Sequence, residues 1–260
     1  MNGWSGLVSA AFSGGVAVKI LDYAVAWLKE SRHAKKTAKA VVDAHLAPLL
    51  RAADEIVGKT RSLAERDFKP LLHAKGYGAQ QNINPDLMGL LYLYAKFWSR
   101  LEILEHDSIG VSIATDKRGV KLKSFLACLE SQRIRLVDRV HQKAISEITT
   151  QLLDDGTLRT IGVVEFTNRV LTDQTVKAWI RPLYDLLMSL HIKARRQRLL
   201  VYGVVVHTLV DALDPEHQST HPRPTYPHKL TKKAKRDIRY RAFGVYLNKI
   251  ASCDRYIQQA

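Results

Sequence analysis

The chain has 260 residues, and 46% of them are hydrophobic, so it can bury a sizeable core and disorder is not the expected state. Its formal net charge of +15 favours polyanionic surroundings, such as nucleic acid or anionic lipid headgroups. The two cysteines, Cys128 and Cys253, lie in no paired motif, which argues against a disulfide framework and a zinc site and suits a reducing cytoplasm.

The first predicted element is a hydrophobic helix over residues 1–30. No charge occurs from Trp4 to Val18, a run of about 22 Å as a helix, against about 30 Å for the hydrocarbon core of a membrane. A lysine near the end of such a run can snorkel to the interface, and aromatic residues mark both interfaces. The residues expected to form a membrane anchor are Trp4, Phe12, Lys19, Tyr23 and Trp27.

A buried soluble helix is the alternative for this segment, because Lys19 and Asp22 interrupt it and its hydrophobicity is modest. The basic run that follows, SRHAKKTAK, favours an orientation with the C-terminal bulk in the cytoplasm. Small residues at Gly6, Ala10 and Gly14 would let two such helices approach closely in lipid. The segment therefore also predicts self-association.

Residues 31–215 are predicted to form a helical bundle domain. A long helix is expected over 33–67, kinked or restarted at Pro48. The next helix is expected to have Asn84 as its N-cap and Pro85 in its first position. Its apolar stripe comprises Leu87, Leu90, Leu91, Tyr94, Trp98, Leu101 and Leu104.

Helical patterns continue through the rest of this domain. One long or two shorter helices are expected over 120–153, and the helix from Asp173 is expected to be interrupted at Pro182. The run KARRQRLLVYGVVVHTLVDALDP is too short for a membrane span and contains His207 and Asp211, so it predicts a central helix. The expected fold class is all-α, a bundle of six to eight helices with a projecting N-terminal hydrophobic helix.

The C-terminal part is predicted to consist of a Pro- and His-rich linker over 216–230 and a basic helix over 231–260. The linker histidines, His217, His221 and His228, match no standard metal-ligand spacing, so a solvated loop is expected. Cations at the start of the helix predict a polyanion-binding surface, with a solvated face as the alternative. These cations are Lys232, Lys233, Lys235, Arg236, Arg239 and Arg241.

The common signatures of nucleotide, dinucleotide, acyl and zinc chemistry do not occur, so no enzyme activity, cofactor or metal is predicted. The densest titratable cluster is EILEHD, where Glu102, Glu105 and His106 share a helix face. Such a trio can bind a metal or move a proton, but a solvated surface is the expected role. Glu165 and Arg169 have the spacing of a structural ion pair.

Four stretches carry a resemblance: APLLRAADEI at 47–56, LYLYAKFWSRLEIL at 91–104, HQKAISEI at 141–148 and LVDALDP at 209–215. In order and spacing they resemble a group of uncharacterised bacterial α-helical proteins with a short N-terminal hydrophobic segment. The resemblance identifies no chemistry. It implies a bacterial source and favours the anchor.

The predicted function is a non-enzymatic helical module at the cytoplasmic face of the bacterial inner membrane. Its expected partners are a membrane or anionic lipid and either a second copy or another protein. The alternative is a soluble, basic, cytoplasmic protein that binds nucleic acid through its C-terminal third, within a mobile-element or defence system. A third interpretation is an enzyme that works at the cluster from Glu102 to Asp107.

Overall fold

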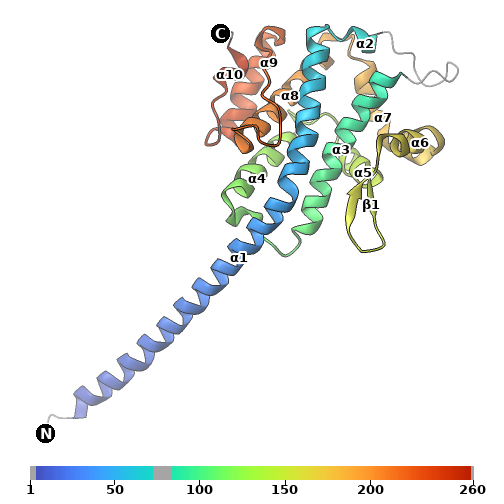
Figure 1. Ribbon diagram of the computed structural model, residues 1–260. Helices are drawn as coiled ribbons and strands as arrows, with labels where there is room; N and C mark the ends of the chain where they lie inside the picture. The colour runs from blue at the N-terminus through green and yellow to red at the C-terminus, as the bar shows by residue number, and fades with distance from the viewer. Residues whose placement is uncertain (1–3, 73–83, 259–260) are drawn as a thin grey trace.

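The computed structural model describes residues 4–72 and 84–258, and within them every side chain except those of residues 4–25, 28 and 72. The described chain is mostly helical, which confirms the predicted class. Its sheet is a two-stranded hairpin that the sequence did not predict. Figure 1 shows the other helices gathered around the C-terminal half of α1, while the N-terminal part of α1 extends away from them.

Helix α1, Trp4–Glu65, is continuous over 62 residues, about 93 Å at 1.5 Å per residue. Pro48 lies inside the helix, so of the predicted kink or restart the restart does not occur. A proline in this position removes one backbone hydrogen bond. Burial of the neighbouring Leu49 and Leu50 against the bundle keeps the helix intact.

Helices α3, Pro85–Asp107, and α8, Lys193–Leu213, pack against α1 and form the centre of the fold. Asn84 caps α3 as predicted, since its side chain accepts a hydrogen bond from the Leu87 amide at 3.0 Å. Residues 199–210 of α8 are all buried, which confirms it as a central helix. The predicted stripe of α3 is buried at every position: Leu87, Leu90, Leu91, Tyr94, Trp98, Leu101 and Leu104.

Shorter helices surround this centre. They are α2 (Lys69–Leu72), η1 (Ile113–Thr115), α4 (Lys117–Glu130), α5 (Arg139–Thr149), α6 (Val163–Thr172) and α7 (Gln174–Met188). The stretch predicted over 120–153 thus forms two helices rather than one. The interruption predicted at Pro182 is wrong, because this residue lies inside α7. Its neighbours Ile180 and Leu183 are buried and hold that helix against the bundle.

The hairpin consists of β1, Thr150–Leu152, and β2, Leu158–Thr160, paired antiparallel. The predicted helix extended to 153, but α5 ends before Thr150. Thr150 and Thr160 lie opposite each other, and their hydroxyl oxygens are 2.8 and 2.9 Å from that of Ser99 on α3. These hydroxyl contacts fasten the hairpin to the bundle. Strands of three residues are too short for alternation to reveal them.

The segment predicted as a solvated linker, 216–230, packs on the bundle instead. Tyr226 and Leu230 are buried, and η2, Pro227–Lys229, lies between them. The Tyr226 hydroxyl donates a hydrogen bond to the Leu200 carbonyl of α8 at 3.2 Å. The segment is a loop as predicted except for η2, and His221 and His228 are exposed. It is not solvated throughout, because prolines indicate a loop but do not show where its apolar residues are buried.

The single basic helix predicted over 231–260 is also wrong in extent. The chain forms α9, Lys232–Asp237, then η3, Ile238–Leu247, a π-helix, and after a turn α10, Asp254–Ile257. A π-helix joins residues five apart by hydrogen bonds. The buried residues Phe243 and Leu247 each lie five positions after another buried residue, so this spacing matches the wider helix.

Candidate functional site

Of the predicted anchor residues, only Trp27 has a described side chain, and it is 67% exposed. The others, Trp4, Phe12, Lys19 and Tyr23, lie where side chains are not described, as do the predicted self-association residues Gly6, Ala10 and Gly14. Among the described residues, no helix has both the length and the apolar character to cross a membrane.

The free part of α1, residues 26–36, lies outside the packed bundle. Every described side chain in it is exposed, and Ala38 is the first buried residue of the helix. Residues 29–39, which reach the edge of the bundle, carry five Lys or Arg residues and one acid, Glu30. None of these cations has an ion pair within the described chain; they are Lys29, Arg32, Lys35, Lys36 and Lys39.

The six cations predicted to bind a polyanion divide into two groups. Arg241 pairs with Asp237 at 2.9 Å, and Arg239 lies 3.4 Å from Asp254. In the described part of the chain the other four have no acidic partner, and we call them the α9 cations: Lys232, Lys233, Lys235 and Arg236. All of them are exposed except Lys235, which is half-buried. The structure therefore narrows the candidate polyanion surface to these four.

The start of α9 lies at the end of the bundle opposite the free part of α1. Lys229, just before α9, donates to the Asp67 carboxylate at 2.8 Å, and Asp67 lies two residues after the C-terminal end of α1. The distance along α1 from Ala38 to Glu65 is about 40 Å at 1.5 Å per residue. The α9 cations and the free part of α1 are therefore separate surfaces.

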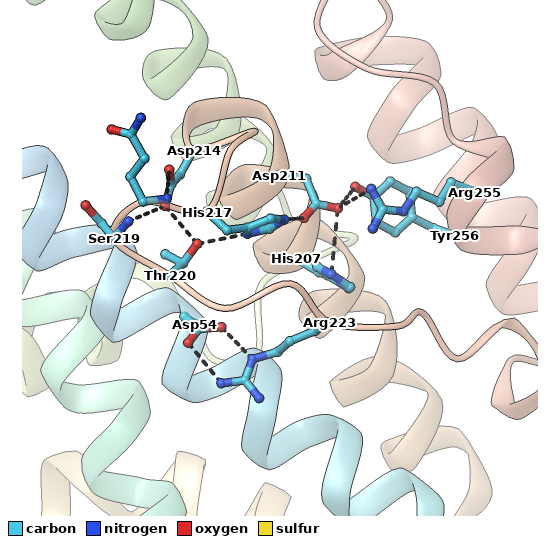
Figure 2. Close-up of polar contacts among 11 residues, drawn as sticks. Asp54, His207, Asp211, Asp214, His217, Ser219, Thr220, Arg223, Arg255 and Tyr256 are labelled. Atoms are coloured by element: carbon cyan, nitrogen blue, oxygen red, sulfur yellow. Dashed lines mark hydrogen bonds and ion pairs between the residues drawn. The ribbon is translucent and has the colours of Figure 1, made fainter.

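A polar cluster around the half-buried Asp211 of α8 was not predicted (Figure 2). The Tyr256 hydroxyl donates to Asp211 Oδ2 at 2.6 Å, and Arg255 Nη1 lies 3.2 Å from the same oxygen. His207 and His217 each place Nε2 3.7 Å from a carboxylate oxygen of Asp211. Burial lowers the pKa of His207, so its ring is neutral at pH 7.

A second polar cluster, around Asp54, joins the segment after α8 to α1. Arg223 donates from Nε and Nη2 to the two carboxylate oxygens of Asp54, and His221 Nδ1 lies 2.8 Å from Oδ2 (Figure 2). Burial would raise the pKa of Asp54, but the hydrogen bonds from Arg223 and His221 outweigh it and hold the pKa below its usual value. The clusters around Asp211 and Asp54 both attach the C-terminal segment to the bundle.

The titratable cluster on α3 forms ion pairs between helices. Glu102 accepts hydrogen bonds from Lys143 of α5 and, at 3.3 Å, from the Ser146 hydroxyl. Asp107 pairs with His106 at 2.9 Å and with His45 of α1 at 3.1 Å. Among the described residues, no three His, Cys, Asp or Glu side chains are arranged to hold a metal ion.

The predicted ion pair between Glu165 and Arg169 is present, with 2.6 Å between Oε1 and Nη2. Both cysteines are free. Burial raises the pKa of the Cys128 thiol to about 12, so that thiol is not nucleophilic at neutral pH.

Two cavities of the described chain differ in the chemistry of their lining. An apolar groove of about 730 Å³ lies between α5 and α7 and includes the exposed side chains of Val140 and Trp179. A smaller cavity of about 360 Å³ lies where α1 ends and α8 begins, and it is lined by several cations. We call the second one the cationic cavity. It combines a concave surface with charged side chains that could orient a ligand, so it is the stronger candidate for a ligand site.

Comparison with known proteins gave no similarity: no protein-family model, no curated protein and no solved structure matches the chain. The resemblance to uncharacterised bacterial proteins therefore stays a prediction.

Proposed function

We propose that this protein is a non-enzymatic helical module that is tethered to a membrane through the N-terminal segment of α1. The observation that supports the proposal is the free part of α1, which continues the helix beyond its last contact with the bundle. An exposed Trp27 and the five unpaired cations accompany it. Tryptophan and basic residues together are typical of helices that meet a membrane interface.

The length of the free part of α1 suits a bundle that is held at a distance from the membrane surface. Residues 26–36 span about 16 Å as a helix, which would hold the bundle away from the surface that the N-terminal segment enters. Anionic headgroups attract basic segments by about 1 kcal/mol for each cation near the surface. The bundle would then act as the interaction module at the cytoplasmic face of the bacterial inner membrane, as one of several identical copies or with another protein.

Deletion of residues 3–28 is expected to move the protein from the membrane fraction to the soluble fraction of a cell lysate. The deletion removes the hydrophobic segment and Trp27 but none of the described buried residues, so the bundle should still fold. Immunoblotting of the two fractions measures the shift, and circular dichroism of the variant checks the fold.

A matched control keeps the hydrophobic segment and replaces Lys35, Lys36 and Lys39 with Gln. This variant is expected to stay in the membrane fraction, with a weaker preference for anionic lipid. If the full-length protein is already soluble and monodisperse without detergent, the tethering proposal is wrong.

The second candidate function is binding of nucleic acid, and the α9 cations favour it. Four cations without acidic partners on one short helix are available to neutralise phosphates. This surface lies at the other end of the bundle from the free part of α1, so a tethered protein could still present it to a soluble polyanion.

A further inference from the structure

The cationic cavity is built from three segments that are distant in sequence. The end of α1 and the turn after it contribute Ala64, Asp67 and Phe68. The first turns of α8 contribute Lys193, Arg196, Gln197 and Leu200, and residues 228–231 complete the lining. Phe68, Leu200 and Leu230 are buried, apolar lining residues, and we call them the floor. Most of the other lining residues are polar or charged, and we call them the rim.

Positive charge dominates this rim. Lys193, Arg196 and Lys229 line it, and Asp67 is the acid among the lining residues. Lys229 pairs with Asp67, but Lys193 and Arg196 have no acidic partner in the described part of the chain. The hydrogen bond from Lys229 lowers the pKa of Asp67, and the charges of Lys69 and Arg196 lower it further. The cavity therefore lies in a positive field that its one carboxylate does not cancel.

The backbone fixes one wall of the cavity. Asp67 and Phe68 have φ angles of 50° and 62°, in the left-handed region. Their amides donate to the carbonyls of Ala64 at 3.1 Å and Leu63 at 2.7 Å, which closes the end of α1 in a Schellman motif. Glycine is preferred where Asp67 stands, so the turn itself does not require a carboxylate. The carboxylate instead holds Lys229 beside the cavity.

We propose that this cavity binds a small organic phosphate. The phosphate would lie between Arg196, Lys193 and Lys229, and the organic part against the floor formed by Phe68, Leu200 and Leu230. A guanidinium can donate two parallel hydrogen bonds to phosphate oxygens, and an ammonium adds a compact charge. A volume of about 360 Å³ lies within the usual range for small-molecule sites, about 300–1,000 Å³.

This site is separate from the membrane attachment and from the α9 cations. The last residue along the chain that lines the cavity is Thr231, so none of the four α9 cations lines it. Lys193 and Arg196 belong to α8, so they can be altered without changing α9.

Isothermal titration calorimetry of the full chain at low salt tests the proposal with adenosine monophosphate, ribose 5-phosphate, inorganic phosphate and adenosine. The two phosphate esters are expected to bind at least about tenfold more tightly than adenosine, because one charge-assisted hydrogen bond contributes about that much to affinity. The esters are also expected to bind more tightly than inorganic phosphate, which has no organic part to cover the floor.

The variant Arg196→Gln is expected to lower the affinity for the esters about tenfold, for the same reason. The matched control is Arg195→Gln, which removes the same charge from the neighbouring exposed position, outside the cavity lining. It should leave the affinity nearly unchanged. Thermal unfolding of both variants checks that they fold, as expected for side chains without an ion pair in the described chain.

Equal losses in Arg195→Gln and Arg196→Gln would overturn the site, because they would show general attraction to a basic surface. Adenosine binding as tightly as its phosphate, or no binding of any probe, would overturn it as well. Inorganic phosphate binding as tightly as the esters would overturn the organic part of the ligand. Loss of binding only in Arg196→Gln, with preference for the esters, supports the proposal.

Discussion

Arg223→Met is expected to lower the free energy of unfolding by about 3 kcal/mol, because it leaves a buried carboxylate without its charged partner. That carboxylate belongs to Asp54 of α1, which is 5% exposed. Arg223 donates to both of its oxygens, whereas methionine has a similar length and donates no hydrogen bond. Urea denaturation followed by circular dichroism measures the loss. His221 still contacts Asp54 in the variant, which places the expected loss at the lower end of the range for such pairs.

The matched control for this prediction is Arg255→Met. Arg255 is more than half exposed, and its partner Asp211 keeps the hydrogen bond from Tyr256, so the expected loss is below about 1 kcal/mol. Equal losses in the two variants would contradict the role given to the pair between Asp54 and Arg223.

The pH dependence of the free energy of unfolding provides a second test of this prediction. The pKa of Asp54 is lower in the folded protein than its ordinary value of 3.8, so its stabilising effect is present above that value and is lost as pH falls through the folded pKa. Arg223→Met removes the main cause of the lowered pKa, so the variant should lose less stability than wild type in this range. The pKa of His207 is also lowered, so this residue reduces stability as pH falls below its ordinary pKa of 6.5. The effect is the same in both proteins and cancels in the comparison.

Replacing all four α9 cations with Gln is expected to flatten the salt dependence of binding to duplex DNA. If each contacts one phosphate, the wild-type log-log slope lies between about −3 and −4, at about −0.9 per contact, and the variant's slope lies near zero. Glutamine is a good helix former, so α9 should remain folded. A salt titration against DNA, RNA and anionic vesicles measures the slopes.

The comparison variant carries Arg239→Gln and Arg241→Gln. Both arginines already have carboxylate partners, so their loss should change the slope less for each charge removed. Equal, weak binding by wild type and the quadruple variant to all three polyanions would contradict the nucleic-acid proposal and leave a solvated face.

Local signals were sufficient to predict the helical elements at the centre of the fold. The cap at Asn84 and the apolar stripe of α3 depend only on neighbouring residues, and both are confirmed. The helix does not restart at Pro48 and is not interrupted at Pro182, because tertiary burial of the residues beside each proline outweighs one lost hydrogen bond. The π-helix η3 was not predicted, since a period of 3.6 was assumed for its apolar residues.

The candidate sites were predicted less completely, because they depend on contacts between distant parts of the chain. The sequence shows the six cations of the C-terminal segment, and the spacing of Asp237 and Arg241 could have shown one of the two ion pairs. No local pattern brings Arg223 to Asp54, which is 169 positions away, or Tyr256 to Asp211. The cationic cavity likewise requires the end of α1 and the start of α8 to meet.

Flotation of the full-length protein with neutral phosphatidylcholine vesicles tests the tethering proposal most directly. At about 1 M salt the Debye length is only about 3 Å, so attraction by the basic residues is screened and binding must come from the hydrophobic segment. The full-length protein is expected to float with the vesicles, whereas the protein without residues 3–28 should stay at the bottom of the gradient. A full-length protein that stays at the bottom, folded and monodisperse, would contradict the tethering proposal.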